Sequence, residues 1–505
     1  MARKRGIALA GLLLFLIVAG AGAGGLESPL PDAAEKQNSA AVRKLVGQGV
    51  DVNQAQVDGM TALHWAAHHD DLETARFLVA AKADVKRANR YEVTPLSLAC
   101  TNGNAAMVEL LLGAGADPNT RLRGGETVLM TAARTGKLGP VRALLARGAD
   151  VDARERRGQT ALMWAAADGH AAVVEALLAA HADFRTPLPS GFTPLFFAVR
   201  EGRADVVRLL LKAGADVNEA MQPKKNAGRG PARGTSPLIL AVENGHFDLA
   251  VELLKAGADP NDQRSGFTAL HMMSWVRKPN RGDGLDDAPP PIGSGTMTNL
   301  DFVRELAARG ANVDARLAKG AGGRSPVAKS GATPFLMACV TADVPFLRTL
   351  LELGADPSTP NSDGCTPLMA AAGVGSLAPG EEAGTETEAY EAVQLALELG
   401  GDVNTVDANG ETAMHGAAYK SLPSVVQLLA DRGAKIEIWN RRNKRGWTPL
   451  MIAEGHRPGN FKPSPETIVA IQRVMAAAGV APPTDAPQAE IRKGYEADSA
   501  AKPTP

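Results

Sequence analysis

The chain has 505 residues, with 54 Lys and Arg against 55 Asp and Glu, so its formal net charge at pH 7 is −1. This balance excludes a global electrostatic field that would attract nucleic acid or an anionic membrane. Only three cysteines occur in the whole chain, which excludes a fold that depends on many disulfides.

The N-terminus has the features of an export signal. Basic residues at 3–5 precede an apolar run over 7–19, and small residues surround Ala21 and Ala23. This order is typical of a secretory signal peptide. We therefore expect a signal peptide over 1–23, cleaved after Ala23, a linker over 24–31, and a periplasmic or secreted protein. The apolar run is short for a membrane-spanning helix, and an uncleaved anchor in the inner membrane is the alternative.

A repeat with a fixed period of 33 residues follows, marked by Thr61, Thr94, Thr127, Thr160 and Thr193. A fixed period of this size indicates a repeat protein. Each Thr is suited to cap a first helix, and in two units Pro at the next position favours the helical φ angle. A Gly turn and a Val and Leu-Leu stripe then predict a second helix. One such unit cannot bury its own apolar face, so the units must stack.

Most units end in G-A-D, whose Gly suits a left-handed position after the second helix, as at Gly115 and Gly214. Lys82 and His181 replace this Gly in two units, and we expect left-handed strain on the order of 1 kcal/mol at each.

Beyond the regular run, equivalent Thr or Ser residues follow at uneven intervals, which locates four insertions. Those near 222–234 and 316–332 fall between units and are basic, whereas those near 277–297 and 374–388 fall between the two helices of one unit. The insertions are interpreted as flexible loops, with recognition loops as the alternative.

The units resemble ankyrin repeats through TPLSLAC at 94–100, TALHWAA at 61–67, GHAAVVEALL at 169–178 and GADVN at 214–218. The resemblance implies an all-α solenoid of about 12 helix-turn-helix units with finger loops between them, which we place over 32–480. Degenerate first and last units are expected to act as caps. The Pro-, Ala- and charge-rich tail over 481–505 is expected to be disordered.

The resemblance also implies that a partner protein binds on the concave face of the array. The family's variable positions are the residue before each Thr and the two residues after the paired small residues of the first helix. The candidate protein-binding residues taken from these positions are Met60, His68, His69, Asn102, Arg134, Gln159, Phe192, Arg200, Phe267 and Trp447.

Among these candidates, Phe192, Phe267 and Trp447 stand at positions expected to be exposed, in a chain with only 4% aromatic residues. Aromatic residues and Arg are the usual anchors of interfaces. The alternative is that each ring lies against its own finger. The stretch 121–234 carries 18 Lys or Arg against 11 Asp or Glu, which favours an acidic partner surface.

Several His and Cys residues have a structural interpretation. His64, His271 and His415 lie three residues after their Thr, where the family's His joins neighbouring units, and His170 and His246 begin second helices. Cys100 and Cys339 occupy a small-residue position and are expected to be buried, whereas Cys365 is expected to be more exposed.

Two rival functions remain open. One is a metal-binding protein or metal-dependent enzyme that uses the cluster around His68 and His69. The other is binding of an anion or polysaccharide through the basic finger loops. No catalytic or nucleotide-binding motif is found. We expect no enzyme activity, no cofactor, no nucleic-acid partner, and a monomer that contacts a membrane only if the N-terminal segment remains as an anchor.

Overall fold

The computed structural model describes residues 28–224, 233–279, 291–318, 330–376, 383–456 and 462–481. Within these ranges the chain forms helices and turns, and β-pairing is limited to two isolated bridges, Ala55 with Thr61 and Arg121 with Thr127. The prediction of an all-α repeat fold is therefore confirmed. The signal peptide and the C-terminal tail predicted from the sequence lie outside the described residues, apart from residue 481.

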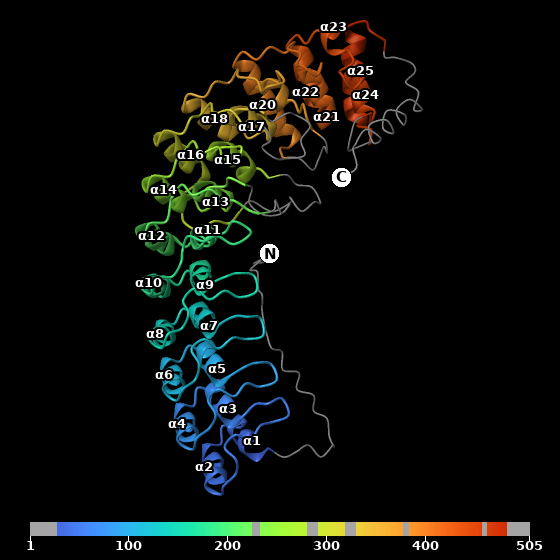
Figure 1. Cartoon of the computed structure of the whole chain (residues 1–505). Helices are drawn as coiled ribbons and strands as arrows, with labels where there is room; N and C mark the ends of the chain where they lie inside the picture. The colour runs from blue at the N-terminus through green and yellow to red at the C-terminus, as the bar shows by residue number, and fades with distance from the viewer. Residues whose placement is uncertain are drawn as a thin grey trace, which may run out of the picture. The chain divides into compact units, whose positions relative to one another are not determined.

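The chain divides into two compact units, Met1–Asp150 and Val151–Pro505. In the first, the described helices are α1 (Pro29–Glu35), α2 (Ser39–Gly47), α3 (Ala62–His68), α4 (Leu72–Ala80), α5 (Pro95–Asn102), α6 (Ala105–Gly113), α7 (Val128–Thr135) and α8 (Leu138–Ala146). Consecutive odd-numbered helices pack side by side, as do consecutive even-numbered ones, so the unit has two rows (Figure 1). The finger loops extend from the row of first helices.

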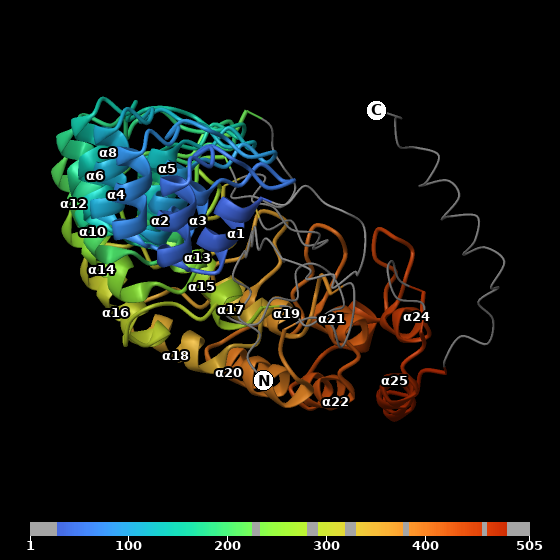
Figure 2. The same cartoon turned by 90° about the horizontal axis from the view of Figure 1, so that it is seen from below.

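The second unit begins with α9 (Ala161–Asp168), α10 (Ala171–Ala179), α11 (Pro194–Arg200), α12 (Ala204–Lys212), α13 (Pro237–Glu243), α14 (Phe247–Lys255), α15 (Ala269–Arg277) and α16 (Asn299–Ala308). It continues with α17 (Pro334–Val340), α18 (Val344–Glu352), α19 (Pro367–Ala371), α20 (Glu386–Glu398), α21 (Ala413–Lys420), α22 (Pro423–Asp431), the short α23 (Ile436–Trp439), α24 (Pro449–Ala453) and α25 (Pro465–Ala477). Figure 2 shows the row of first helices from α13 to α24 beside the row of second helices from α14 to α25.

The local sequence explains where each helix begins and ends. The Thr61 hydroxyl accepts a hydrogen bond from the His64 amide at the start of α3, and Thr94 does the same for Ser97 at the start of α5. Gly115 and Gly214 adopt φ angles of 96° and 94° after their second helices. Lys82 and His181 are forced into the same region, with φ angles of 69° and 63°. The strain predicted for these two side chains is therefore present.

Neighbouring repeats are joined by a recurring rung of hydrogen bonds. The side-chain oxygen of an Asn or Asp accepts the backbone N–H of the next repeat, as between Asn119 and Asp150 at 2.7 Å or Asn218 and Asp259 at 2.8 Å. The same Asn side chains donate to the carbonyls of Gly148 and Gly257. Equivalent rungs join Asn53 to Asp84, Asp152 to Asp183, Asn261 to Asn312, Asp314 to Asp356 and Asn404 to Lys435.

The ends and insertions differ in detail from the sequence-based boundaries. Helix α1 begins at Pro29, three residues before the expected start of the array at residue 32. Glu386 and Glu388, which we placed in a loop, belong to the first turn of α20, where Thr385 and Glu388 form a capping box. Among the described residues, no helix has the length and apolar character needed to cross a membrane.

Candidate functional site

The candidate binding residues belong to the same kind of surface in each compact unit. We call it the first-helix face and define it as the outer side of the first helices together with the residue before each capping Thr or Ser. All ten candidates lie in described parts of this face. Their burial and contacts vary widely.

In the Met1–Asp150 unit, three aromatic rings gather on α3 and its C-cap residue. Trp65 stacks on His69 at a centroid distance of 5.7 Å, and His68 meets both rings edge-on at 5.6 and 5.0 Å. Asn102 of α5 donates to the His68 carbonyl at 2.8 Å. The structure thus brings His68, His69 and Asn102 together, and adds Trp65, which the sequence analysis did not select.

The two histidines of this cluster are not arranged as metal ligands. The ring nitrogens of His69 lie 3.4 Å from the Gln37 amide and 3.0 Å from the Glu35 carbonyl. Burial and the neighbouring His69 lower the pKa of His68, which favours its neutral form. In the described residues, no three His, Cys, Asp or Glu side chains are grouped to hold one ion. The geometry adds no support to the metal-binding alternative.

In the Val151–Pro505 unit, the Phe192 ring is buried rather than exposed, with only 6% of its surface accessible. It packs against Phe197 at 5.0 Å and Phe196 at 6.2 Å, both on α11, and the Arg200 guanidinium covers Phe192 and Phe197. The expectation of an exposed ring is therefore wrong, because α11 carries two further Phe residues that draw Phe192 inward. Arg200, paired with Glu201 at 2.9 Å, is the accessible part of this group.

The remaining candidates lie in repeats of their own. Phe267 is half-buried against Trp275 at 5.4 Å, and Trp447 is half-buried beneath the Arg445 guanidinium at 5.8 Å. Met60 is 6% exposed and contributes to the core. Gln159 is half-buried at a finger turn, and Arg134 is exposed at the end of α7. His68, Asn102 and Arg134 are therefore the exposed candidates, whereas Arg200 and Trp447 are half-buried.

His64, His271 and His415 have the structural role that the resemblance implies. Each Nδ1 lies 2.7 to 2.9 Å from the hydroxyl of its own Thr, and each Nε2 lies 3.0 to 3.2 Å from a carbonyl of the next repeat. Burial lowers the pKa of each to about 4, so the rings are neutral at pH 7. These histidines hold neighbouring repeats together.

The cysteines are buried at all three positions. Cys100 and Cys339 are inaccessible, as predicted, but Cys365 is 1% exposed and the expectation of greater exposure is wrong. Its amide is fixed by the Asn361 side chain, which turns Cys365 into the finger and toward the core. Burial raises the pKa of Cys100 to about 12, which makes that thiol a poor nucleophile.

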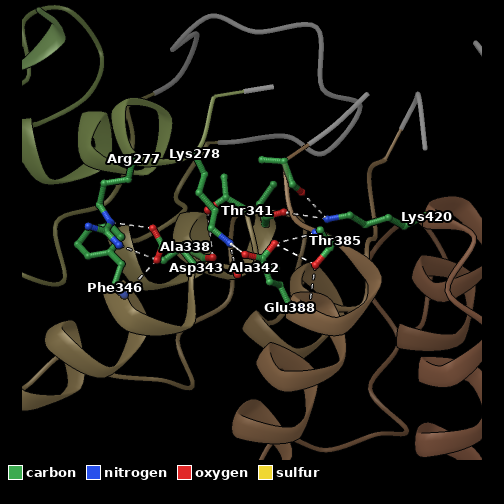
Figure 3. Close-up of polar contacts among 12 residues, drawn as sticks. Arg277, Lys278, Ala338, Thr341, Ala342, Asp343, Phe346, Thr385, Glu388 and Lys420 are labelled. Atoms are coloured by element: carbon green, nitrogen blue, oxygen red, sulfur yellow. Dashed lines mark hydrogen bonds and ion pairs between the residues drawn. The ribbon is translucent and has the colours of Figure 1, made fainter. Parts of the chain in front are cut away.

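Charged side chains, buried or half-buried, link the repeats around the insertions near 277–297 and 374–388 (Figure 3). We call Arg277, Lys278, Asp343, Glu388 and Lys420 the brace. Arg277, the last residue of α15, forms two hydrogen bonds to Asp343, whose side chain is fully buried and caps α18. Lys278 then bonds the Ala342 carbonyl at 2.9 Å and the Glu388 carboxylate at 2.8 Å. The start of one insertion is thereby fastened to the end of the other.

Lys420 completes this brace from α21. It stands at one of the family's variable positions, yet it is only 7% exposed, and its ammonium donates to the Ala383 carbonyl at 2.9 Å. Figure 3 shows Lys420 approaching from the side opposite Lys278. The brace therefore joins four successive repeats, from α15 to α21, through side chains that belong to no repeat consensus.

A second buried polar group lies farther along, around Glu411. One carboxylate oxygen accepts hydrogen bonds from the Tyr419 hydroxyl at 3.1 Å and the Asn443 amide at 2.8 Å, while the other has no hydrogen-bond partner among the described residues. Burial raises the pKa of Glu411 to about 7. Asn443 belongs to the next finger, so this group joins two repeats.

Sequence reasoning missed Trp65, Phe197 and Trp275 as ring-bearing positions of the face. A signal was present, because Trp65 and Phe197 both follow their capping Thr by four residues. In the structure Trp65 donates to Gln56 of its finger and Phe197 packs against Phe192. The contacts of Glu411, Lys278 and Lys420 with other repeats carried no such signal.

Comparison with known proteins agrees with this geometry. A sequence model of ankyrin repeats (three copies) matches residues 30–122, 129–221 and 383–460, and a single ankyrin repeat model matches 233–264. The three-copy model alone covers more than half of the chain, and the chain belongs to the ankyrin repeat family.

Individual relatives match only in part. The chain is 29% identical over 131 residues to the probable 26S proteasome regulatory subunit p28 of Saccharomyces cerevisiae, which covers 25% of this chain and 51% of the relative. It is 28% identical over 198 residues to the human SH3 and multiple ankyrin repeat domains protein 2, covering 35% of this chain and 10% of the relative. The crystal structure of the human ASB11 ankyrin repeat domain aligns at 28% identity and a TM-score of 0.40, over 46% of this chain and all of that domain.

The chain thus spans about half the length of one curated relative and a tenth of the other. Ankyrin repeats generally form protein-binding scaffolds without catalytic activity, and that general class is what the family membership gives. It does not name a partner.

Proposed function

We propose that this chain is an exported, non-catalytic scaffold that binds a partner protein along its first-helix face. The observation that carries the proposal is the array itself, because matched ankyrin repeats account for more than half of the chain. A long stacked array offers more surface than the roughly 800 Å² per partner that a standard interface requires.

The contact residues proposed are five of the sequence candidates. In the first compact unit these are the exposed His68, Asn102 and Arg134, and in the second they are the half-buried Arg200 and Trp447, chosen for their residue type. Arg and Trp are frequent binding hot spots, since they pair large contact area with directed polar groups. Met60 and Phe192 support the face from beneath, and half-buried His69, Gln159 and Phe267 border it.

Capture of partners from the native cell envelope tests this proposal. Photo-crosslinking and pull-down with the full chain are expected to recover a partner whose yield falls about tenfold for Arg200→Ala or Trp447→Ala, by loss of a hot-spot contact. Glu109→Ala and Glu175→Ala are matched controls, because both alter exposed second-helix residues. Equal capture by all four variants, with their folds intact, would remove the first-helix face as the binding surface.

The proposed export is tested separately. Cell fractionation should place the chain in the periplasm or medium, and the intact mass of the mature protein should correspond to a chain beginning at residue 24. A full-length mass in the membrane fraction would replace the cleaved signal with an anchor.

A further inference from the structure

The second half of the insertion between α15 and α16 is tied back to the preceding repeat. We call residues 291–298 the strap. The strap runs against the N-terminal end of α14, and its backbone touches that of the α13–α14 turn so closely that a Cβ on Gly293 would lie 1.7 Å from the Gly245 carbonyl oxygen. Only glycine fits at this crossing.

Two side chains at the start of α14 fasten the strap. The Ser294 N–H donates to Nδ1 of His246 at 2.8 Å, and the Ser294 hydroxyl lies 3.0 Å from the same nitrogen. The N–H groups of Thr296 and Met297 both donate to one oxygen of Asp248, at 2.7 and 3.2 Å. Residues 294–297 are thus bound by one imidazole and one carboxylate.

The other nitrogen of the His246 ring reaches the first-helix face. Nε2 lies 3.0 Å from the carbonyl oxygen of Arg200, the last residue of α11. Since Nδ1 accepts a hydrogen bond from the Ser294 N–H, the hydrogen of the neutral ring is on Nε2, where it donates to Arg200. His246 is 7% exposed, so water replaces neither bond easily.

We propose that the strap is a proton-released latch on the Arg200 end of α11, closed at neutral pH and opened by acid. The step is a proton transfer from solvent to Nδ1 of His246. Nδ1 then carries a hydrogen and becomes a donor. Because the Ser294 N–H is also a donor, the hydrogen bond between Ser294 and His246 breaks. The Ser294 hydroxyl is the nearest remaining acceptor for the new N–H.

The surrounding charges are consistent with a neutral ring in the closed latch. Burial lowers the pKa of His246; the Arg200 carbonyl and the Glu201 carboxylate raise it in part, and Arg203 lowers it further. Asp248, two residues along α14, holds the strap rather than the ring. After release the ring regains an ordinary pKa of about 6.5. Each pH unit below this value therefore raises the ratio of open to closed strap by up to about tenfold, until the ring also becomes protonated in the closed form.

The consequence for binding rests on the proposed function. Arg200 covers Phe192 and Phe197 and is one of the proposed contact residues. An open strap uncovers the His246 ring, so water can compete for the bond between Nε2–H and the Arg200 carbonyl, which loosens the end of α11 where this side chain is attached. Partner affinity at this part of the face is therefore expected to fall in acid.

Amide hydrogen exchange of the purified full chain, without a partner, tests the latch itself. After correction for intrinsic rates, protection of residues 294–297 is expected to fall at least about tenfold between about pH 7.5 and 5, because exchange follows local opening. His246→Gln, whose amide can donate to Arg200 and accept from Ser294 but cannot titrate, should keep its protection. Equal protection of the wild type at both pH values overturns the proposal, as does an acid release in His246→Gln like that of the wild type.

Two further variants sharpen this measurement. His170→Gln alters the equivalent capping residue of α10 and should leave the strap's pH response unchanged. Ser294→Ala keeps the N–H donor but removes the acceptor available to the protonated ring, so its strap should open at a higher pH than that of the wild type. A Ser294→Ala strap that opens at a lower pH than the wild-type strap would contradict the geometry.

Partner capture as a function of pH separates the latch from the proposed function. If both hold, the wild type loses captured partner in acid and His246→Gln retains it. An acid-opened strap together with capture that ignores all first-helix variants would keep the latch and reject the binding face. If hydrogen exchange of the strap does not respond to acid but partner capture falls for Arg200→Ala, the binding face is kept and the latch is rejected.

Discussion

The two compact units stack the same kind of repeat but hold it together differently. In Met1–Asp150 the repeats are evenly spaced, and capping Thr residues and Asn rungs use atoms that nearly every repeat provides. In Val151–Pro505 four insertions interrupt the spacing. There, side chains such as Arg277, Asp343 and Lys420 form additional contacts between repeats, beyond the rungs. Repetition therefore suffices for stacking, whereas each departure from the period brings its own specific contacts.

The largest expected effect comes from breaking the brace. Arg277→Ala leaves the fully buried Asp343 carboxylate without its cation, which should destabilise the fold by about 3–5 kcal/mol. Urea denaturation followed by circular dichroism measures the loss. Arg208→Ala is the matched control, because its pair with Glu252 is exposed and should contribute less than about 1 kcal/mol. Similar costs for both variants would mean that the brace is no stronger than a surface pair.

The next effect depends on pH and on Glu411. Its folded pKa of about 7 lies above the unfolded value of 4.5, so the folded state keeps the proton longer. Its contribution to stability should therefore fall as pH rises from 4.5 to 7 and stay constant above, by on the order of 3 kcal/mol in total. Denaturation midpoints of the wild type and Glu411→Gln, compared across this range, should diverge. Parallel pH profiles would refute the assignment.

A smaller effect should be the same in both compact units. Asn119→Ala and Asn218→Ala each remove a rung whose side chain both accepts from and donates to the next repeat. We expect each to cost about 0.5–1.5 kcal/mol, the net value of an ordinary hydrogen bond. A cost several times larger for Asn218, by the same denaturation assay, would show that insertions change how rungs act.

The smallest effect has the opposite sign. Lys82→Gly and His181→Gly relieve left-handed strain, one in each compact unit, but add freedom to the unfolded chain. The net gain should be about 0.5 kcal/mol for each, seen as a modest rise in the thermal unfolding midpoint. Gly115→Ala, which introduces the strain, should lower it.

The repeating part of the fold was readable from the sequence. Thr at each helix start, Gly after each second helix and small residues between them act locally, so Thr61 or Gly214 could be assigned without knowledge of any neighbour. The bridging role of His64 followed from its offset after Thr and the family resemblance. The sequence misplaced the start of α1 because that helix begins with Pro29 and lacks a repeat signature.

The site was less predictable, because its accessibility depends on contacts between segments. Phe192 is buried by two Phe residues of α11, and Cys365 is drawn inward by Asn361, neither of which a position within the repeat reveals. The ion pair between Lys278 and Glu388 joins residues more than a hundred positions apart, one at the start of one insertion and one at the end of another. Such pairs have no periodic signal.

The rungs between repeats have an evolutionary consequence. In the rung that joins Asn119 to Asp150, the Asn119 side chain contacts only main-chain atoms of the next repeat. The rung therefore does not depend on which side chains the next repeat carries. A repeat can therefore be duplicated, lost or exchanged and still find a donor and an acceptor on either side. Array length is free to drift while each junction stays intact, whereas the repeats fastened by the Arg277 brace can change only together.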